Sequence, residues 1–335
     1  MADLIAQFMA AAKGRGHTVV LPEGADPRVV AAARRIADER IAEPIVLGAP
    51  EEIQRAAAEA GATLDGVRTI NPTDLERSER YTAAYAAERG LNERVARRMV
   101  VRPVVFGGMM VKQGDADTMV AGVRTATANV IQAGALTVGY AAGITTASSF
   151  FLMIMPEFRG RKGQPLVFAD CAVNIAPTAE QLADIALASA TSAAKLLDEP
   201  PRVAMLSFST QGSAAHERVD VVTRAAEIIR QRAPDAPIDG EFQADAALMP
   251  QVAAKKIKRP SDVAGKANVL IFPDLNAGNI GYKLTQYLAG ARAIGPFLQG
   301  FAKPISDLSR GASVEDIIGT VAVCLAQTRG TADAL

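Results

Sequence analysis

The sequence predicts an α/β protein with parallel sheets that are covered by helices on both faces, and three observations predict it. Short apolar, strand-like runs alternate with segments of helical period almost throughout the chain. The length of 335 residues corresponds to about two domains, each large enough to bury its own core. Hydrophobic residues make up 49% and charged residues 21% of the chain, which rules out a mostly disordered protein.

The N-terminal part of the chain contains two strand–helix pairs. Residues 18–21 (TVVL) form the first expected strand, and a helix is expected from near Pro27 (PRVVAAARRIADER). Residues 44–47 (PIVL) form the next strand, and a further helix begins after Pro50. Right-handed crossovers place the strand-to-helix loops of such units at one edge of a parallel sheet, where ligands of α/β proteins usually bind.

The middle of the chain departs from this alternation. Residues 149–155 (SFFLMIM) and 165–170 (PLVFAD) are apolar runs joined by a charged, glycine-rich turn. This pattern predicts a hairpin and therefore a mixed sheet. Beyond the hairpin the alternation resumes, with strands expected at 203–206 and 269–272 and helices expected at 214–232, at 276–289 and from Ser313 onward.

The order of these elements predicts two domains, one of them made from both ends of the chain. A boundary is expected near Gly139–Ser148, before the hairpin. The first α/β domain is predicted to comprise residues 1–142 and 294–335, and the second to comprise residues 143–293. No internal repeat or low-complexity tract is visible in the sequence.

Two apolar segments and the cysteines bear on location. Residues 1–12 are apolar but carry Asp3 and no basic region, so no signal peptide is expected. Residues 125–155 carry no charge, but polar residues and glycines divide them into helix, loop and strand, which favours a buried core over a membrane span. Cys171 and Cys324 are far apart in apolar settings, which provides no disulfide framework and favours the reducing cytoplasm.

Charge and motif patterns exclude several classes of function. Lys+Arg and Asp+Glu number 36 each, so the formal net charge is +0 and no nucleic-acid partner is expected. The Gly-Arg-Gly at 14–16 is no dinucleotide fingerprint, the Gly-Lys at 265–266 is no P-loop, and no GxSxG elbow occurs. With only His17 and His216, a His-rich metal site or a Ser-His-Asp triad has almost no raw material.

The segment 295–317 (GPFLQGFAKPISDLSRGASVEDI) carries the most informative chemistry. Ser309 and Arg310 lie in a glycine-containing turn at the entrance of the last expected helix. A hydroxyl, a guanidinium, backbone amides and the positive end of a helix dipole together suit a phosphate or another oxyanion. A structural interpretation is also open, because Ser313 and Asp316 are spaced as in a capping box.

Six short stretches, in order along nearly the whole chain, resemble the phosphate acetyl/butyryltransferase family. They read LPEGADPR (21–28), FADCAVN (168–174), LSFSTQGS (206–213), DGEFQADA (239–246), FPDLNAGNIGYK (272–283) and the Ser-Arg-Gly segment. The resemblance implies a fold like that of isocitrate and isopropylmalate dehydrogenases, with two three-layer α/β domains and a cleft between them. It also implies interconversion of acetyl-CoA and phosphate with acetyl phosphate and CoA, no bound cofactor or metal, and a homodimer.

The resemblance further implies roles for particular residues. Asp316 would be the general base for the CoA thiol, Ser309 would help hold the tetrahedral transition state, and Arg310 would bind the phosphoryl group. Direct attack of the thiolate in a ternary complex is expected, because no Cys or Ser lies beside a histidine base. The substrate-binding residues would be Arg89, Arg124, Thr127, Ser209, Asn276, Asn279, Tyr282, Lys283 and Gln286.

One position departs from the family pattern. An arginine that contacts phosphate is expected about ten residues beyond Gly122, but the chain has Gln132 there. Arg124 either supplies the missing charge or is a solvated loop residue, and Gln211 stands where a lysine is common. Fewer cations leave three readings open: an acetyltransferase, a propionyl- or butyryl-specific transferase, and a non-catalytic acetyl-CoA sensor.

Overall fold

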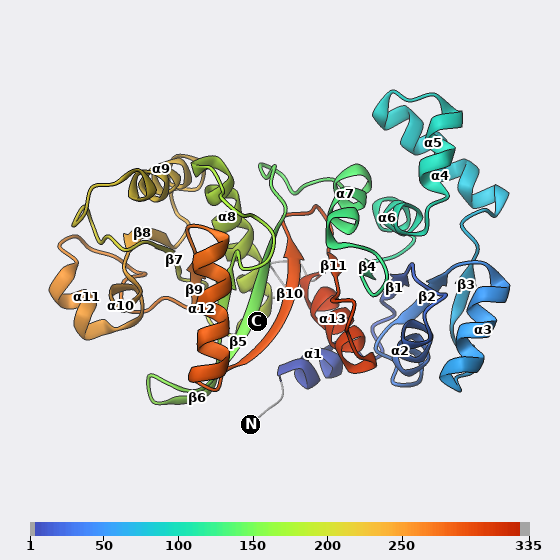
Figure 1. The fold of residues 1–335 in the computed structure, drawn as a ribbon, viewed down its shortest axis with the longest axis horizontal. Helices are drawn as coiled ribbons and strands as arrows, with labels where there is room; N and C mark the ends of the chain where they lie inside the picture. Colours follow the sequence, from blue (N-terminus) through green and yellow to red (C-terminus); the bar gives the residue numbers. More distant parts are fainter. Residues whose placement is uncertain (1–3, 329–335) are drawn as a thin grey trace. The chain divides into compact units, whose positions relative to one another are not determined.

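The structure is a computed structural model that describes residues 4–328, and these residues form two compact α/β units (Figure 1). The first unit comprises residues 4–142 and 301–328, and the second comprises Gly143–Gly300. The predicted return to the first unit at residue 294 is wrong, because Arg292–Gln299 is a strand of the second unit. From its sequence, the apolar run after Ala291 could belong to the first unit or to the second. Only its long-range strand pairing decides between the two units.

A five-stranded parallel sheet forms the centre of the first unit, in the order β11-β4-β1-β2-β3. Its strands are β1 (Thr18–Leu21), β2 (Glu43–Leu47), β3 (Arg68–Ile70), β4 (Thr118–Ala121) and β11 (Ile305–Asp307). Asp307 at the end of β11 is opposite Ala121 at the end of β4. Because parallel strands end at the same edge, the loop after β4 lies beside the loop that contains Ser309 and Arg310.

Helices cover both faces of this sheet (Figure 1). One layer contains α1 (Leu4–Ala12), α2 (Pro27–Asp38), α3 (Pro50–Ala60) and α13 (Val314–Gln327). The other contains α6 (Pro103–Gln113) and α7 (Thr127–Thr137), with α4 (Leu75–Arg89) and α5 (Glu93–Val100) packed outside them. Ile36, Ile317 and Val321 are fully buried between α2, α13 and the sheet, and their burial stabilises this layer.

The second unit has a six-stranded mixed sheet in the order β10-β5-β6-β9-β7-β8. The strands are β5 (Ser148–Phe158), β6 (Arg161–Ala169), β7 (Val203–Leu206), β8 (Ile238–Phe242), β9 (Val269–Ile271) and β10 (Arg292–Gln299). The antiparallel pairing of β5 with β6 confirms the predicted hairpin and mixed sheet. The pairs β6–β9, β9–β7 and β7–β8 are parallel. Together with the parallel sheet of the first unit, they confirm the predicted α/β class.

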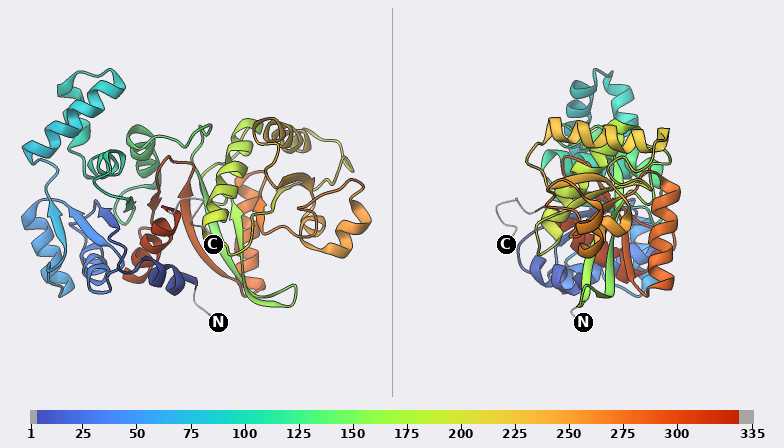
Figure 2. Two further views of the ribbon diagram at one scale, coloured as in Figure 1. Left: turned by 180° about the vertical axis from the view of Figure 1, so that it is seen from behind. Right: turned by 90° about the vertical axis from the view of Figure 1, so that its left-hand side faces the viewer.

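The helices of the second unit lie on both faces of its sheet. They are α8 (Ala179–Leu196), α9 (Glu217–Arg232), α10 (Ala244–Leu248), α11 (Pro250–Lys256) and α12 (Leu275–Leu288). The helix α12 packs beside β6 and β10, which is visible from behind in Figure 2. Gly278 permits this close packing, because a Cβ there would lie 2.2 Å from the carbonyl oxygen of Asp170.

The helix starts follow from local sequence. Asp26 is the N-cap of α2 and accepts from the backbone N–H of Arg28, while Pro27 takes the first helical position, as predicted. At α13 the Ser313–Asp316 capping box predicted as the structural interpretation is present. Residues 125–155 form α7, a loop and most of β5, as predicted. Within residues 4–328, no helix is long and apolar enough to cross a membrane.

Candidate active site

The turn between β11 and α13 exposes the side chains of Ser309 and Arg310. The Ser309 hydroxyl accepts from the backbone N–H of Gly311 at 3.2 Å, and the N–H of Ala312 donates to the Ser309 carbonyl at 2.9 Å. Ser309 can therefore still donate its hydroxyl hydrogen, and the Arg310 guanidinium faces solvent. The turn presents a donor and a cation side by side, which suits a phosphate or an oxyanion.

Arg28 of α2 holds this turn from within the unit. Its Nη1 donates to the carbonyl oxygens of Arg310 and Ala312, both at 2.9 Å. The rest of the guanidinium forms a two-point pair with Asp26, Nε to Oδ1 at 3.0 Å and Nη2 to Oδ2 at 2.9 Å. Burial alone would raise the pKa of Asp26, but the hydrogen bonds from Arg28 outweigh burial and lower that pKa. Asp26 therefore remains ionised and orients Arg28.

The loop after β4 is organised by the buried carboxylate of Glu23. Oε2 accepts from the N–H groups of Gly122 and Val123, both at 2.9 Å, and Oε1 accepts from Arg124 at 2.9 Å and Thr125 at 2.7 Å. Four successive N–H groups converging on one carboxylate form a backbone nest. Glu23 thus fixes the segment that carries Arg124 and leads into α7.

Asp307 lies beneath the same loop. It is 5% exposed, accepts from the Thr127 hydroxyl, and its Oδ1 is buried without a hydrogen-bond partner among the described residues. Burial, with a smaller contribution from the charge of Glu23, raises the pKa of Asp307 to about 6 despite the Thr127 hydrogen bond. Thr127, predicted to bind substrate, is thus engaged within the protein through its hydroxyl.

Asp316 serves as the third helical residue of α13. Its Oδ2 accepts from the Ser313 N–H at 2.9 Å and the Ser313 hydroxyl at 2.8 Å, and its side chain is exposed. These contacts orient the carboxylate and stabilise the start of α13. Capping and catalysis are compatible here, because both contacts use one carboxylate oxygen. The role of Asp316 as general base stays a prediction.

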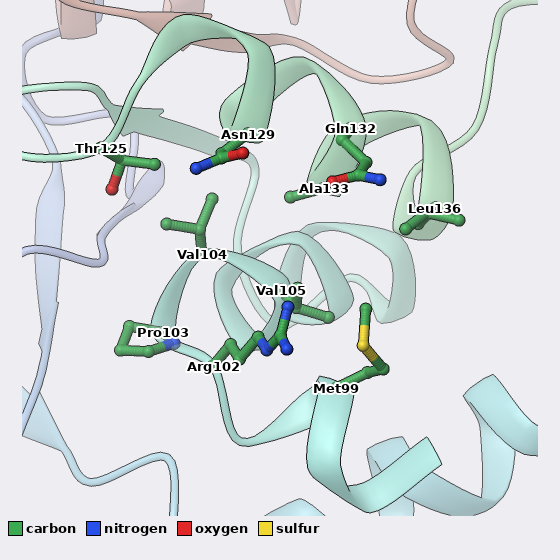
Figure 3. A pocket seen from close by; sticks show the side chains of 10 residues that line it. All are labelled: Met99, Arg102, Pro103, Val104, Val105, Thr125, Asn129, Gln132, Ala133 and Leu136. Carbon is green, nitrogen blue, oxygen red and sulfur yellow. The ribbon is translucent and has the colours of Figure 1, made fainter. Parts of the chain in front are cut away.

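The other predicted cations of the first unit lie in different settings. Arg89, the last residue of α4, donates to the carbonyl oxygen of Ala135 in α7 at 2.9 Å. Arg124 is exposed, and its charge contributes to the lowered pKa of Asp26. Gln132, which occupies the position of the expected arginine, lines a pocket of about 230 Å³ between α6 and α7 (Figure 3). Arg124 is not part of that lining.

The remaining predicted residues belong to the second unit, and Ser209 is fully buried there. Its hydroxyl donates to Glu241 Oε1 at 2.9 Å and accepts from the N–H of Ala214 at 3.2 Å. Glu241 also accepts from the N–H of Gly212 at 2.7 Å. This hydroxyl thereby shapes the 207–213 loop, and the role of Ser209 in substrate binding stays a prediction.

The predicted polar residues of α12 gather on one side of the helix. Their spacing of three and four residues places Asn276, Asn279, Lys283 and Gln286 on a single face. The Asn279 amide donates to the carbonyl of Cys171 at 3.2 Å. Tyr282 is different, because its ring stacks on Phe151 with centroids 4.3 Å apart. The ring of Tyr282 packs against the sheet, and a ligand role for its hydroxyl stays a prediction.

Three supporting residues escaped the sequence-based prediction: Glu23, Asp26 and Arg28. All three lie in the stretch LPEGADPR, which the resemblance singled out without assigning them roles. The Asp-Pro-Arg helix start was a readable signal for Asp26, whereas the partners of Glu23 are about a hundred residues away. No group of three or more metal-binding side chains occurs among residues 4–328.

Comparisons with known proteins point in one direction. The family model described as phosphate acetyl/butaryl transferase matches residues 3–325. A phosphate acetyltransferase from Thermoanaerobacterium thermosaccharolyticum is 45% identical over 331 residues, covering 98% of this chain and 100% of that protein.

Solved structures agree with the sequence comparison. The EutD phosphotransacetylase from Staphylococcus aureus superposes with a TM-score of 0.88 at 36% identity, covering 98% of this chain and 99% of the other. A phosphotransacetylase from Streptococcus pyogenes also gives 0.88, at 41% identity, covering 97% and 98% of the two chains.

The Glu23 nest gives a first testable prediction. Glu23→Gln should lower the free energy of unfolding by about 1–3 kcal/mol, because an amide NH₂ would then face two N–H groups that have lost their acceptor. Denaturant unfolding measures the loss, and hydrogen exchange should show faster exchange at residues 122–125. Glu43→Gln, at an exposed carboxylate, is the matched control. Wild-type stability with unchanged exchange in Glu23→Gln would contradict the nest.

The raised pKa of Asp307 predicts a pH dependence of stability. The unfolded carboxyl ionises near pH 4 and the folded one near 6, so its contribution to stability is complete below pH 4 and is lost as pH rises through 6. Asp307→Asn removes this loss, so the variant should gain about 3 kcal/mol relative to wild type between pH 4 and 7. Denaturation at several pH values measures it, with exposed Asp65→Asn as control. A parallel pH dependence in wild type and Asp307→Asn would refute the shift.

Proposed function

We infer the function of this chain from the family to which it belongs, the phosphate acetyl/butyryltransferases: it is a phosphate acetyltransferase. The reaction interconverts acetyl-CoA and phosphate with acetyl phosphate and CoA. The observation that carries this conclusion is the match over nearly the whole of both chains at 45% identity to a phosphate acetyltransferase. The propionyl- or butyryl-specific and sensor alternatives are not favoured by these relatives.

We propose that the acetyl group moves by direct attack within a ternary complex. Asp316 takes the proton from the CoA thiol as the sulfur attacks the carbonyl carbon of acetyl phosphate. The tetrahedral oxyanion then collapses, the bond from carbon to the phosphate oxygen breaks, and phosphate leaves with that electron pair. Removing the proton is worthwhile because a free thiol, with a pKa near 8.5, is mostly protonated at neutral pH.

The exposed turn of Ser309 and Arg310 supports this mechanism. Ser309 donates to the developing oxyanion, and Arg310 neutralises charge on the phosphoryl group. The hydrogen bonds from Arg28 support both roles, because they fix the backbone of the turn through the carbonyl oxygens of Arg310 and Ala312. Donors fixed before the reaction need no rearrangement as the charge develops, which is the main source of their effect.

CoA binding and the cofactor requirement complete the proposal. The polar face of α12, with Asn276, Asn279, Lys283 and Gln286, contributes to CoA binding. Lys283 is exposed and supplies a positive charge for a phosphate of CoA.

No bound cofactor is needed, because a general base and oxyanion donors suffice for acyl transfer between a thiol and phosphate. We place the protein in the cytoplasm, a proposal supported by two free, buried cysteines.

We propose that the protein is a homodimer that pairs through α12. Ile280, Leu284, Tyr287 and Leu288 are 52–81% exposed and form an apolar stripe at helical spacing. The stripe is continued by Ile175, 76% exposed, whose carbonyl accepts from the N–H of Leu275 at the start of α12. A second copy of this chain would cover such a stripe through a self-complementary, two-fold contact.

The catalytic proposal is tested by following thioester formation from acetyl phosphate and CoA. Wild type should turn over, and Asp316→Asn should lower kcat by about 10²–10⁴-fold with little change in the KM for CoA. Glu315→Gln is the matched control, since it removes a neighbouring exposed carboxylate that pairs with the surface residue Arg35. An Asp316→Asn enzyme as fast as Glu315→Gln would remove Asp316 from the mechanism.

Leu284→Glu tests the dimer, because a charge in the centre of the apolar stripe opposes its own symmetry mate. Sedimentation velocity should show dimeric wild type and monomeric Leu284→Glu. Val95→Glu, at a 48% exposed apolar side chain of α5, should remain dimeric. Monomeric wild type, or a dimer that survives Leu284→Glu, would rule out pairing through α12.

A further inference from the structure

The pocket between α6 and α7 has a divided lining (Figure 3). Arg102, Thr125, Asn129 and Gln132 supply polar groups. The apolar lining residues are Met99, Pro103, Val104, Val105, Ala133 and Leu136. The lining contains one cation and no carboxylate. A pocket of this kind suits a small anion with a short apolar part.

Arg102 is directed by the start of α6. Pro103 occupies the first helical position, and a residue before proline is pushed out of the helical region, so Arg102 adopts φ −73° and ψ 127°. Its side chain is exposed, and within residues 4–328 its guanidinium has no ion pair or hydrogen bond. Figure 3 shows the guanidinium rising from this position toward the interior of the pocket. Its charge is thus available to a ligand.

Gln132 shares this pocket but brings no charge. The amide side chains of Gln132 and Asn129 come from successive turns of α7, across the pocket from Arg102 (Figure 3). Arg89 is anchored to the carbonyl of Ala135, one residue before the lining residue Leu136. Arg124, the sequence-based candidate for the missing cation, does not line this pocket. Arg102 is therefore the cation that faces Gln132.

We propose that Arg102 binds the phosphoryl group of the acyl phosphate, or orthophosphate in the reverse direction, in this pocket. Gln132 and Asn129 add neutral hydrogen-bond donors, and the charge of Arg102 acts in addition to the charge that Arg310 contributes. The proposal rests on the proposed function and assigns to Arg102 the charge that Gln132 lacks. A guanidinium suits this role because its planar fork matches two phosphate oxygens. With a volume of about 230 Å³, the pocket is below the usual size for drug-like ligands and fits a molecule as small as acetyl phosphate.

Steady-state kinetics with Arg102→Gln test the assignment. The KM for acetyl phosphate should rise about tenfold or more, and the KM for CoA should change far less, because one charge-assisted interaction to phosphate is lost. Arg98→Gln is the matched control: Arg98 is also exposed, belongs to neighbouring α5, and does not line the pocket. An unchanged KM for acetyl phosphate in Arg102→Gln, or an equal rise in Arg98→Gln, would overturn the proposal.

A double variant that moves the arginine from position 102 to position 132 provides a stricter test. Adding Gln132→Arg to Arg102→Gln should restore most of the lost affinity for acetyl phosphate, whereas a merely structural role of Arg102 would not be rescued. Protection of the purified protein against thermal unfolding by inorganic phosphate should weaken in Arg102→Gln and return in the double variant. This binding readout needs no turnover, so inactive wild type would refute the proposed function, while phosphate protection unaffected by Arg102→Gln would refute the role of Arg102.

Discussion

The carboxylate of Glu23, with its four backbone hydrogen bonds, is the interaction on which the edge of the first sheet depends. It joins the loop after β1 to the loop after β4. The second loop in turn touches the end of β11, since a Cβ on Gly122 would lie 2.5 Å from the backbone of Leu308. Gly122 also has φ +115°, a conformation that glycine adopts readily. One buried anion thus sets the positions of three strand ends.

The charged groups near this edge differ in how many hydrogen bonds and ion pairs they form within the protein. Glu23 accepts four hydrogen bonds, and Asp26 is paired in two places with Arg28. Asp307 is buried, and this burial outweighs the hydrogen bond from Thr127 and raises the pKa of the carboxyl. Glu23 and Asp26 orient loops through these hydrogen bonds, whereas Arg310 and Arg102 form no ion pair within residues 4–328. A cation without an internal partner keeps more of its electrostatic attraction for an incoming anion.

Local chemistry made much of the fold predictable, and long-range pairing limited the rest. The starts of α2 and α13 could be read from Asp-Pro-Arg and from the Ser313–Asp316 spacing, and the β5–β6 hairpin from its turn. The pairing of β10 with β5 could not be predicted, because the residues of a strand do not specify which other strand it pairs with. The same applies to the site. Ser309 and Arg310 stand out in their turn, whereas the burial of Ser209 and the exposure of Arg102 depend on distant packing.

The first unit is assembled from two segments of the chain that are synthesised at different times. Its edge strand β11 pairs with β4, and α13 completes the layer that contains α2, yet about 160 residues of the second unit are synthesised between these segments. The second unit is continuous in sequence and can fold as soon as it emerges. Until β11 and α13 are made, the nascent first unit exposes the open side of β4 and the apolar surface of α2, and exposed surfaces of this kind favour aggregation.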